Sequence, residues 1–274
     1  MKRKLRIIVL ISLVLWASGC TAIQQFGSTS SPPATAHPPG IDPTGVQDPD
    51  RLLDAHFDQL DGRSYATVAV FRVEYPNGTV MAESRTRTRM AANRSRWTHD
   101  ISWSGTVPSE PDLADRASIY VNGDRGHWLI ETGGGTRVIS GDVTSLGLSS
   151  RSRVFERRST FKTVFSNVNR SSMDSSPPFR LRATVDRGER APKLLQTGLD
   201  LAPQGEPQFT DDVTVVAHID PSGLIRETCI SWHHRGPTFP SREPTWTGTV
   251  RYCVEFVQVG DVNVRRPGWV RNAS

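Results

Sequence analysis

Two cysteines in the C-terminal third have the spacing and setting of a disulfide. The chain has 3 cysteines, and Cys229 and Cys253 lie in two stretches that alternate between apolar and polar residues. If these stretches pair as neighbouring strands, both thiols lie on the polar face of the sheet. A bridge would add about 3 kcal/mol of stability on the chain-entropy model, and it needs an oxidising compartment. The alternative is two free thiols in a register that never meets.

Other residues suited to chemistry form no recognisable motif. His233 and His234 are adjacent, with His218 upstream and Glu243 nearby, but neighbouring side chains on a strand point to opposite faces. The chain contains no Gly-x-Ser-x-Gly nucleophile elbow and no phosphate-binding glycine loop. We therefore expect a protein that is not an enzyme and that has no metal site and no cofactor.

A row of arginines alternates with threonines. Arg85, Arg87 and Arg89 would place their guanidinium groups on one face of a strand. The simpler interpretation is a solvated outer face, and the alternative is contact with anionic lipid headgroups or acidic surface glycans.

Asn-x-Ser/Thr sequons begin at Asn77, Asn93, Asn169 and Asn272. If an exported chain meets an oligosaccharyltransferase, Asn93 and Asn169 are the better candidates for N-glycosylation. Asn77 falls in a tight turn, and Asn272 is almost at the terminus.

Residues 1–19 are expected to form a signal peptide. Basic residues at positions 2–6 precede the apolar run Ile7–Ala17, which is shorter than the about 20 residues that span a membrane. The end of the run, Ser18-Gly19-Cys20, resembles the lipobox of bacterial and archaeal lipoproteins, which implies that Cys20 carries lipid. Plain secretion and an uncleaved anchor are the alternatives. We expect a protein anchored in the cell membrane by lipid and facing outwards.

The charge of the mature chain argues against nucleic-acid binding. The sequence has 33 Lys and Arg against 28 Asp and Glu, but four of the cations belong to the signal peptide. The remaining chain is close to neutral, whereas a nucleic-acid-binding domain needs a basic patch.

Residues 20–49 are expected to be a disordered tether. Prolines are interleaved there with Ser, Thr, Gly and Ala, and such a stretch buries too little apolar surface to become ordered. Residues 50–274 then form a single β-rich extracytoplasmic domain.

Strand patterns dominate this domain. An amphipathic helix is expected over Asp50–Leu60, capped by Asp50, and a second over residues 159–168. Asn77-Gly78 and Asn122-Gly123 are hairpin signals. The expected strands include Ser64–Tyr75, Thr79–Met90, Trp128–Thr132, Val213–Ile219, Leu224–Trp232 and Thr247–Val259.

Alternation with one apolar face predicts an antiparallel sheet. The expected fold class is mainly β, formally α+β, with a single curved antiparallel sheet (a half-barrel) wrapped around two or so short helices. Because two helices cover only part of a long sheet, incomplete filling would leave an apolar cleft. Residues expected to face that cleft are Phe71, Val250, Tyr252, Val254 and Phe256.

Several short segments resemble the uncharacterised membrane lipoproteins of halophilic archaea. Besides Ser18-Gly19-Cys20, they are Ala55-His56, Ser64-Tyr65, Asn77–Val80, Ile219–Ile225 and Arg266–Val270. Proteins of this type resemble the lipoprotein-carrier (LolA-like) fold. The resemblance implies a curved antiparallel sheet around helices with an apolar cleft.

Two functions follow from these patterns. The first is a non-catalytic, membrane-anchored, cell-surface binding module for an apolar ligand, either a lipid or a hydrophobic protein segment. The alternative is a structural or interaction protein of the cell envelope with no ligand pocket. The expected partners are the membrane, through lipid on Cys20, an apolar ligand and an unidentified envelope protein, with no nucleic acid.

The lipid anchor can be tested by replacing its attachment atom. Because lipid forms a thioether with sulfur, Cys20→Ser is expected to move the protein from the membrane fraction to the medium, or to leave it as unprocessed precursor. Fractionation and gel mobility measure this. A variant that fractionates and migrates like the wild type would show that Cys20 carries no lipid.

Overall fold

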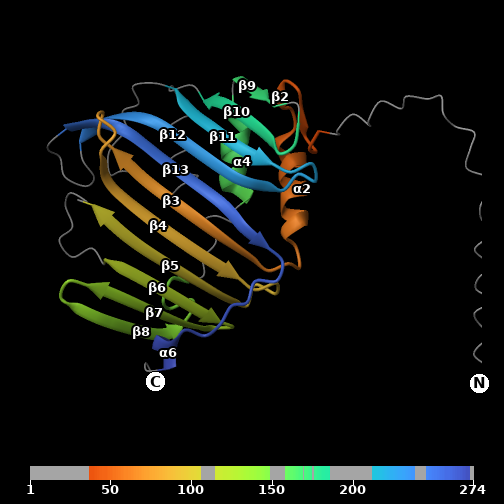
Figure 1. Cartoon of the computed structure of the whole chain (residues 1–274). Helices are drawn as coiled ribbons and strands as arrows, with labels where there is room; N and C mark the ends of the chain where they lie inside the picture. Colours follow the sequence, from red (N-terminus) through yellow and green to blue (C-terminus); the bar gives the residue numbers. More distant parts are fainter. Residues whose placement is uncertain are drawn as a thin grey trace, which may run out of the picture. The chain divides into compact units, whose positions relative to one another are not determined.

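The computed structural model describes residues 37–105, 115–148, 158–168, 170–174, 176–185, 212–237 and 245–271. The chain divides into Met1–Ala36 and His37–Ser274, and all described residues belong to the second unit. This unit is mainly β, with an eleven-stranded antiparallel sheet that curves without closing and two short helices packed on one of its faces (Figure 1). The expected fold class is confirmed.

The large sheet consists of two meanders joined at its centre. Strands β3 to β8 follow one another across one half, strands β9 to β13 follow one another across the other, and β3 pairs with β13 between them. The first meander contains β3 (Tyr65–Glu74), β4 (Val80–Met90), β5 (Arg96–Gly105), β6 (Arg116–Asn122), β7 (Arg125–Thr132) and β8 (Gly135–Asp142). The second contains β9 (Arg170–Met173), β10 (Phe179–Val185), β11 (Val213–Ile219), β12 (Ile225–Pro237) and β13 (Thr245–Val259).

The strands expected from alternation match β3, β4, β7, β11, β12 and β13 apart from their ends. β12 is five residues longer at its end than the expected strand, because it continues from Trp232 to Pro237 and pairs there with the start of β13. His233 and His234 thereby become strand residues, one exposed and one buried, as adjacent positions on a strand require.

The first helix, α2 (Pro49–Leu60), corrects one detail of the sequence interpretation. Its N-cap is Asp48 and not Asp50, since the Asp48 carboxylate accepts a hydrogen bond from the Arg51 N–H at 3.0 Å. Proline suits the first helical position because its missing N–H would have no partner there. The second helix, α4 (Arg158–Ser166), lies close to the expected range, and a third, α6 (Gly268–Arg271), ends the described chain.

The expected tether of residues 20–49 extends too far into the domain. Residues 41–46 form a small hairpin of β1 (Ile41–Asp42) and β2 (Gly45–Val46). Ile41 is 7% exposed and belongs to the same apolar cluster as Leu52 of α2. This burial gives the hairpin the apolar contacts that the proline-rich composition did not suggest, so residues 41–49 belong to the folded domain.

Both α2 and α4 pack on the same face of the sheet, which we call the inner face. Val164 of α4 shares an apolar cluster with Val250, Tyr252 and Val254 of β13, and the Phe256 ring lies against His56 of α2 at 5.1 Å. These four side chains of β13, which were expected to face a cleft, therefore lie on the face that carries the helices. Among the described residues, none of the helices has the length and apolar character needed to cross a membrane.

The opposite, outer face carries the two cysteines. Cys229 of β12 lies directly opposite Cys253 of β13, and a disulfide joins them. The bridge therefore links the two strands that the sequence pattern paired, on the face turned away from the helices.

Removal of this bridge should destabilise the domain without changing its fold. Cys229→Ala/Cys253→Ala is expected to lower the free energy of unfolding by about 3 kcal/mol, because the unfolded chain loses a loop constraint. Denaturant unfolding of the two proteins measures the difference. The mature domain should show no titratable thiol when it is unfolded without reductant; two free thiols there would contradict the bridge.

Candidate functional site

The inner face between the helices and the sheet is the candidate site, and α2 forms one side of it. His56 is fully buried, and its Nδ1 accepts a hydrogen bond from the Ile225 N–H at 3.2 Å. The proton of the neutral ring must then sit on Nε2. The rings of Phe57, Phe161 and Phe256 surround the imidazole at 4.9, 5.2 and 5.1 Å between centroids. Burial lowers the pKa of His56 to about 3.

A close backbone approach supports this contact between α2 and the sheet. Gly223, in the turn between β11 and β12, has a φ of +89°, and a Cβ on it would lie 2.6 Å from the Cβ of Ala55. Only glycine fits this turn without displacing the helix. Two of the segments that carried the sequence resemblance, Ala55-His56 and Ile219–Ile225, are thus packed against each other.

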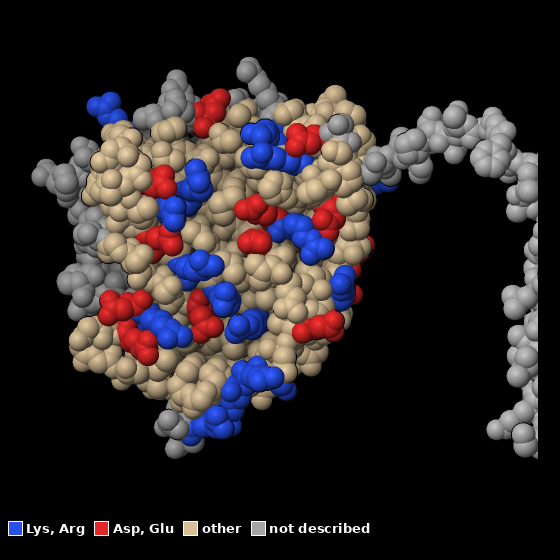
Figure 2. Space-filling model, viewed as in Figure 1, with Lys and Arg blue, Asp and Glu red and all other residues tan. Residues whose placement is uncertain are grey.

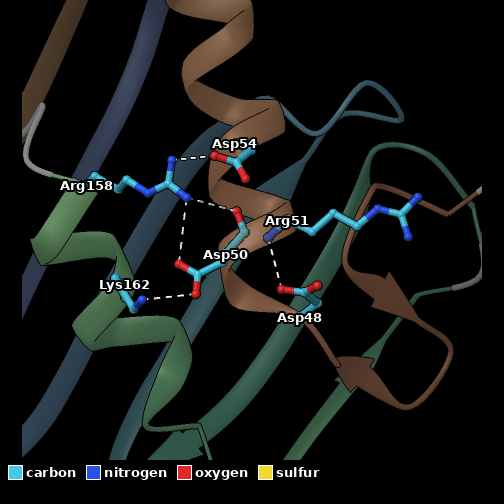
Figure 3. Close-up of polar contacts among 6 residues, drawn as sticks. All are labelled: Asp48, Asp50, Arg51, Asp54, Arg158 and Lys162. Carbon is cyan, nitrogen blue, oxygen red and sulfur yellow. Dashed lines mark hydrogen bonds and ion pairs between the residues drawn. The ribbon is translucent and has the colours of Figure 1, made fainter.

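Helix α4 lies beside α2 and is joined to it by exposed ion pairs (Figure 3). Lys162 donates to the Asp50 carboxylate at 2.9 Å, and Arg158 contacts both Asp50 and Asp54. The hydrogen bond from Lys162 lowers the pKa of Asp50. Exposed pairs of this kind stabilise a contact only weakly. The position of α4 therefore depends mainly on its apolar side, where Phe161, Val164 and Phe165 are buried.

Four of the five side chains expected to line a cleft belong to the packed core. Val250, Tyr252, Val254 and Phe256 are each at most 8% exposed, and burial raises the pKa of Tyr252. Phe71 differs from them, because it is only partly buried at the edge of the same cluster. The core beneath α2 and α4 is therefore filled at these four positions, whereas the neighbouring Phe71 is only partly buried.

Beyond Phe71, the inner face carries further apolar side chains that are only half-buried. Strand register places Phe71 in one row with Ser84 and Trp103, and it places Ile101 in a second row with Ala117 and Ile130. Four of these residues form what we call the inner margin: Phe71, Ile101, Trp103 and Ile130, all of intermediate exposure. The sequence interpretation included Phe71 but missed the other three, although Ile101 and Trp103 alternate with polar residues as strand residues do.

The outer face carries scattered basic and acidic side chains among other residues (Figure 2). The Arg72 guanidinium bonds to Glu83 at 2.7 Å, and His218 lies 2.9 Å from Glu227. Over β4, β5 and β6 this face contains an open depression of about 550 Å³, lined by Arg85, Arg87, Arg89, Asp100, Ile101, Ser102 and Arg116.

The remaining sequence candidates are scattered. Glu227 lies within 4.8 Å of both cysteine sulfurs, but sulfurs in a disulfide are not thiolates and do not ligate a metal. Asn93 is exposed in the turn between β4 and β5, where its side-chain oxygen accepts a hydrogen bond from the Ser95 N–H at 3.2 Å. Cys20, Asn169 and Glu243 lie outside the residues that the structure describes.

Comparison with known proteins adds little to this geometry. No protein-family model matches the sequence, and no curated protein does. Solved structures that match include the crystal structure of a LolA superfamily protein, NE2245, from Nitrosomonas europaea. It is 9% identical, with a TM-score of 0.24, over 81% of this chain and 96% of that one. A likeness at this level carries no inference about function, and membership of the halophilic archaeal lipoproteins stays a prediction.

The buried histidine predicts how stability depends on pH. Unfolding raises the pKa of His56 from about 3 to its ordinary 6.5, so the unfolded state binds more protons between these values. Stability should fall as the pH is lowered from about 7 towards 3, by up to about 1.4 kcal/mol per pH unit for this group. His99, whose pKa burial lowers to about 4, adds in the same direction.

His56→Asn keeps an acceptor near the Ile225 N–H but cannot titrate, so its free energy of unfolding should depend less steeply on pH. The exposed His233→Asn is the matched control and should keep the wild-type slope. Denaturant unfolding at a series of pH values measures both. Equal slopes in all three proteins would show that His56 is not buried in its neutral form.

Proposed function

We propose that this protein is an outward-facing membrane lipoprotein, anchored through Cys20, that binds an apolar ligand on the inner face of its sheet. The observation that carries the proposal is the inner margin, where apolar side chains beside a packed core are only half-buried. Water-exposed apolar surface of this kind costs free energy, and an apolar ligand that covers it recovers that cost.

The inner margin has the composition of an apolar binding surface. Trp103, Phe71, Ile101 and Ile130 supply the hydrophobic area, and polar groups of β4 lie between them in the same rows, among them Ser84. Ligand sites commonly combine mostly apolar walls with a few hydrogen-bonding groups that fix orientation. A lipid chain or a hydrophobic protein segment fits this chemistry, and both were expected from the sequence.

The burial of Val250, Tyr252, Val254 and Phe256 favours the second candidate function. A core that is filled at these positions is what a structural or interaction protein of the cell envelope needs. The two functions differ in a measurable property, since only the first requires that a ligand occupies the inner margin.

Ligand binding can be measured directly. Native mass spectrometry of the protein purified from its membrane is expected to show a bound lipid or peptide in excess of the mass of the lipidated chain. After the ligand is removed, the neutral fluorophore N-phenylnaphthylamine should bind to the same surface. Ile101→Ala/Trp103→Ala should weaken that binding about tenfold, because it removes most of the apolar area of β5.

A matched control is available on the outer face. Val138→Ala/Val257→Ala also removes two partly exposed apolar side chains, which are 37% and 47% exposed, and it should leave probe binding unchanged. If both variants bind the probe like the wild type, and no ligand co-purifies, the structural function is the correct one.

A further inference from the structure

The described lining of the outer depression contains four arginines and a single carboxylate, Asp100. Among the described residues, Arg85, Arg87 and Arg89 form no ion pair, and the only carboxylate contact of Arg116 is with Glu131 at 4.0 Å. Two other arginines, Arg72 and Arg226, each have a carboxylate within hydrogen-bond distance. Figure 2 shows a row of basic side chains with an acidic one beside it near the middle of this face.

The strand register sets the spacing of these groups. Arg85, Arg87 and Arg89 lie on alternate positions of β4, so consecutive guanidinium groups start about 7 Å apart and the row spans about 14 Å. Arg116 is two strands away from Arg85, across Ser102, which adds a fourth cation at about 10 Å to the side. An extended ligand that carries several anionic groups matches this row, whereas a single small anion contacts only part of it.

Asp100 restricts the classes of ligand that the depression can bind. It lies opposite Arg87 on β5, inside the depression, and next to the hydroxyl-bearing Ser102. A carboxylate in the middle of a cationic site repels a ligand that is anionic throughout, but it accepts hydrogen bonds from hydroxyl groups. The combination fits a molecule with alternating carboxylates and hydroxyls.

We propose that the outer depression binds an acidic polysaccharide, with sugar carboxylates on the row of arginines and sugar hydroxyls on Asp100. Guanidinium groups pair with carboxylates through two parallel hydrogen bonds, which favours arginine over lysine at such a site. Single-stranded nucleic acid fits less well, because its binding surfaces carry aromatic rings for base stacking and the described lining contains none. The charged groups of this site lie on the face opposite the inner margin, and Ile101 is the residue that both sites share.

The probe is an oligogalacturonate, and its methyl ester, which keeps the ring hydroxyls but loses the charge, is the control ligand. The full-length lipoprotein in detergent is expected to bind the acid and not the ester, more weakly at higher salt. Arg85→Gln/Arg87→Gln/Arg89→Gln should weaken binding roughly ten- to hundredfold. The control with the same loss of charge is Arg182→Gln/Arg235→Gln/Arg251→Gln, three exposed, outward-facing residues outside the depression. It should change binding by less than about twofold.

Asp100→Ala separates recognition of the sugar from attraction by charge. The change makes the depression more positive, so a polyanion held by charge alone would bind more tightly. The proposal requires weaker binding of the oligogalacturonate, because a hydroxyl acceptor is lost. Thermal unfolding of each variant verifies that it is folded.

Three results would overturn the proposal: equal effects of the two arginine triples, tighter binding by Asp100→Ala, or a preference for phosphatidylglycerol vesicles or inorganic phosphate over the oligogalacturonate. The vesicle result would identify the depression as a membrane contact, and the phosphate result would identify a small-anion site.

Discussion

The apolar face of a long sheet must be shielded from water, and the rest of this structure depends on how much of that face the helices bury. Pairing of β3 with β13 joins two meanders into one surface of eleven strands, about 48 Å wide at the usual strand spacing. The two inner helices have 12 and 9 residues, so they are only about 18 and 14 Å long. Their side chains share an apolar cluster with buried residues from β3 to β6 and from β10 to β13, whereas Ile101, Trp103 and Ile130 of β5 and β7 stay half-buried.

The two helices are attached to the sheet by different means. α2 is attached to the turn between β11 and β12, because His56 accepts a hydrogen bond from the Ile225 N–H and Gly223 leaves room for the Ala55 side chain. A buried N–H without a partner costs free energy, so the histidine can be replaced only by another acceptor. α4 is held by the apolar contacts of Phe161, Val164 and Phe165 and by its exposed ion pairs with α2. The turn between β11 and β12 therefore determines where the helix layer begins.

Alternation and turn signals predicted the central strands, both inner helices and the position of the disulfide, because these depend on local pattern. β5 was missed although Trp97, Ile101 and Trp103 alternate, since His99 interrupts the apolar series and polar residues fill the rest. The inner margin was missed with it. The outer depression was predicted only as the arginine row of β4. Asp100 and the more distant Arg116 join it through strand pairing, which one strand's pattern does not contain.

The inner margin and the outer depression lie back to back on β5, where Ile101 faces inwards and Ser102 outwards. A slip of β5 by one residue against β4 would turn Ile101 and Trp103 to the outer face and Asp100 and Ser102 to the inner face. Their register is unbroken from Ala82–Gly105 to Met90–Trp97, and the turn that ends it is held by Arg94. Arg94 has a φ of +59°, which costs about 1 kcal/mol or more in a residue other than glycine. Its guanidinium donates to the Leu60 carbonyl at 2.6 Å and lies 4.7 Å from the centre of the Tyr65 ring. The strained turn is thereby tied to the end of α2 and the start of β3, so the contact that fixes the register also connects the helix layer to both surfaces.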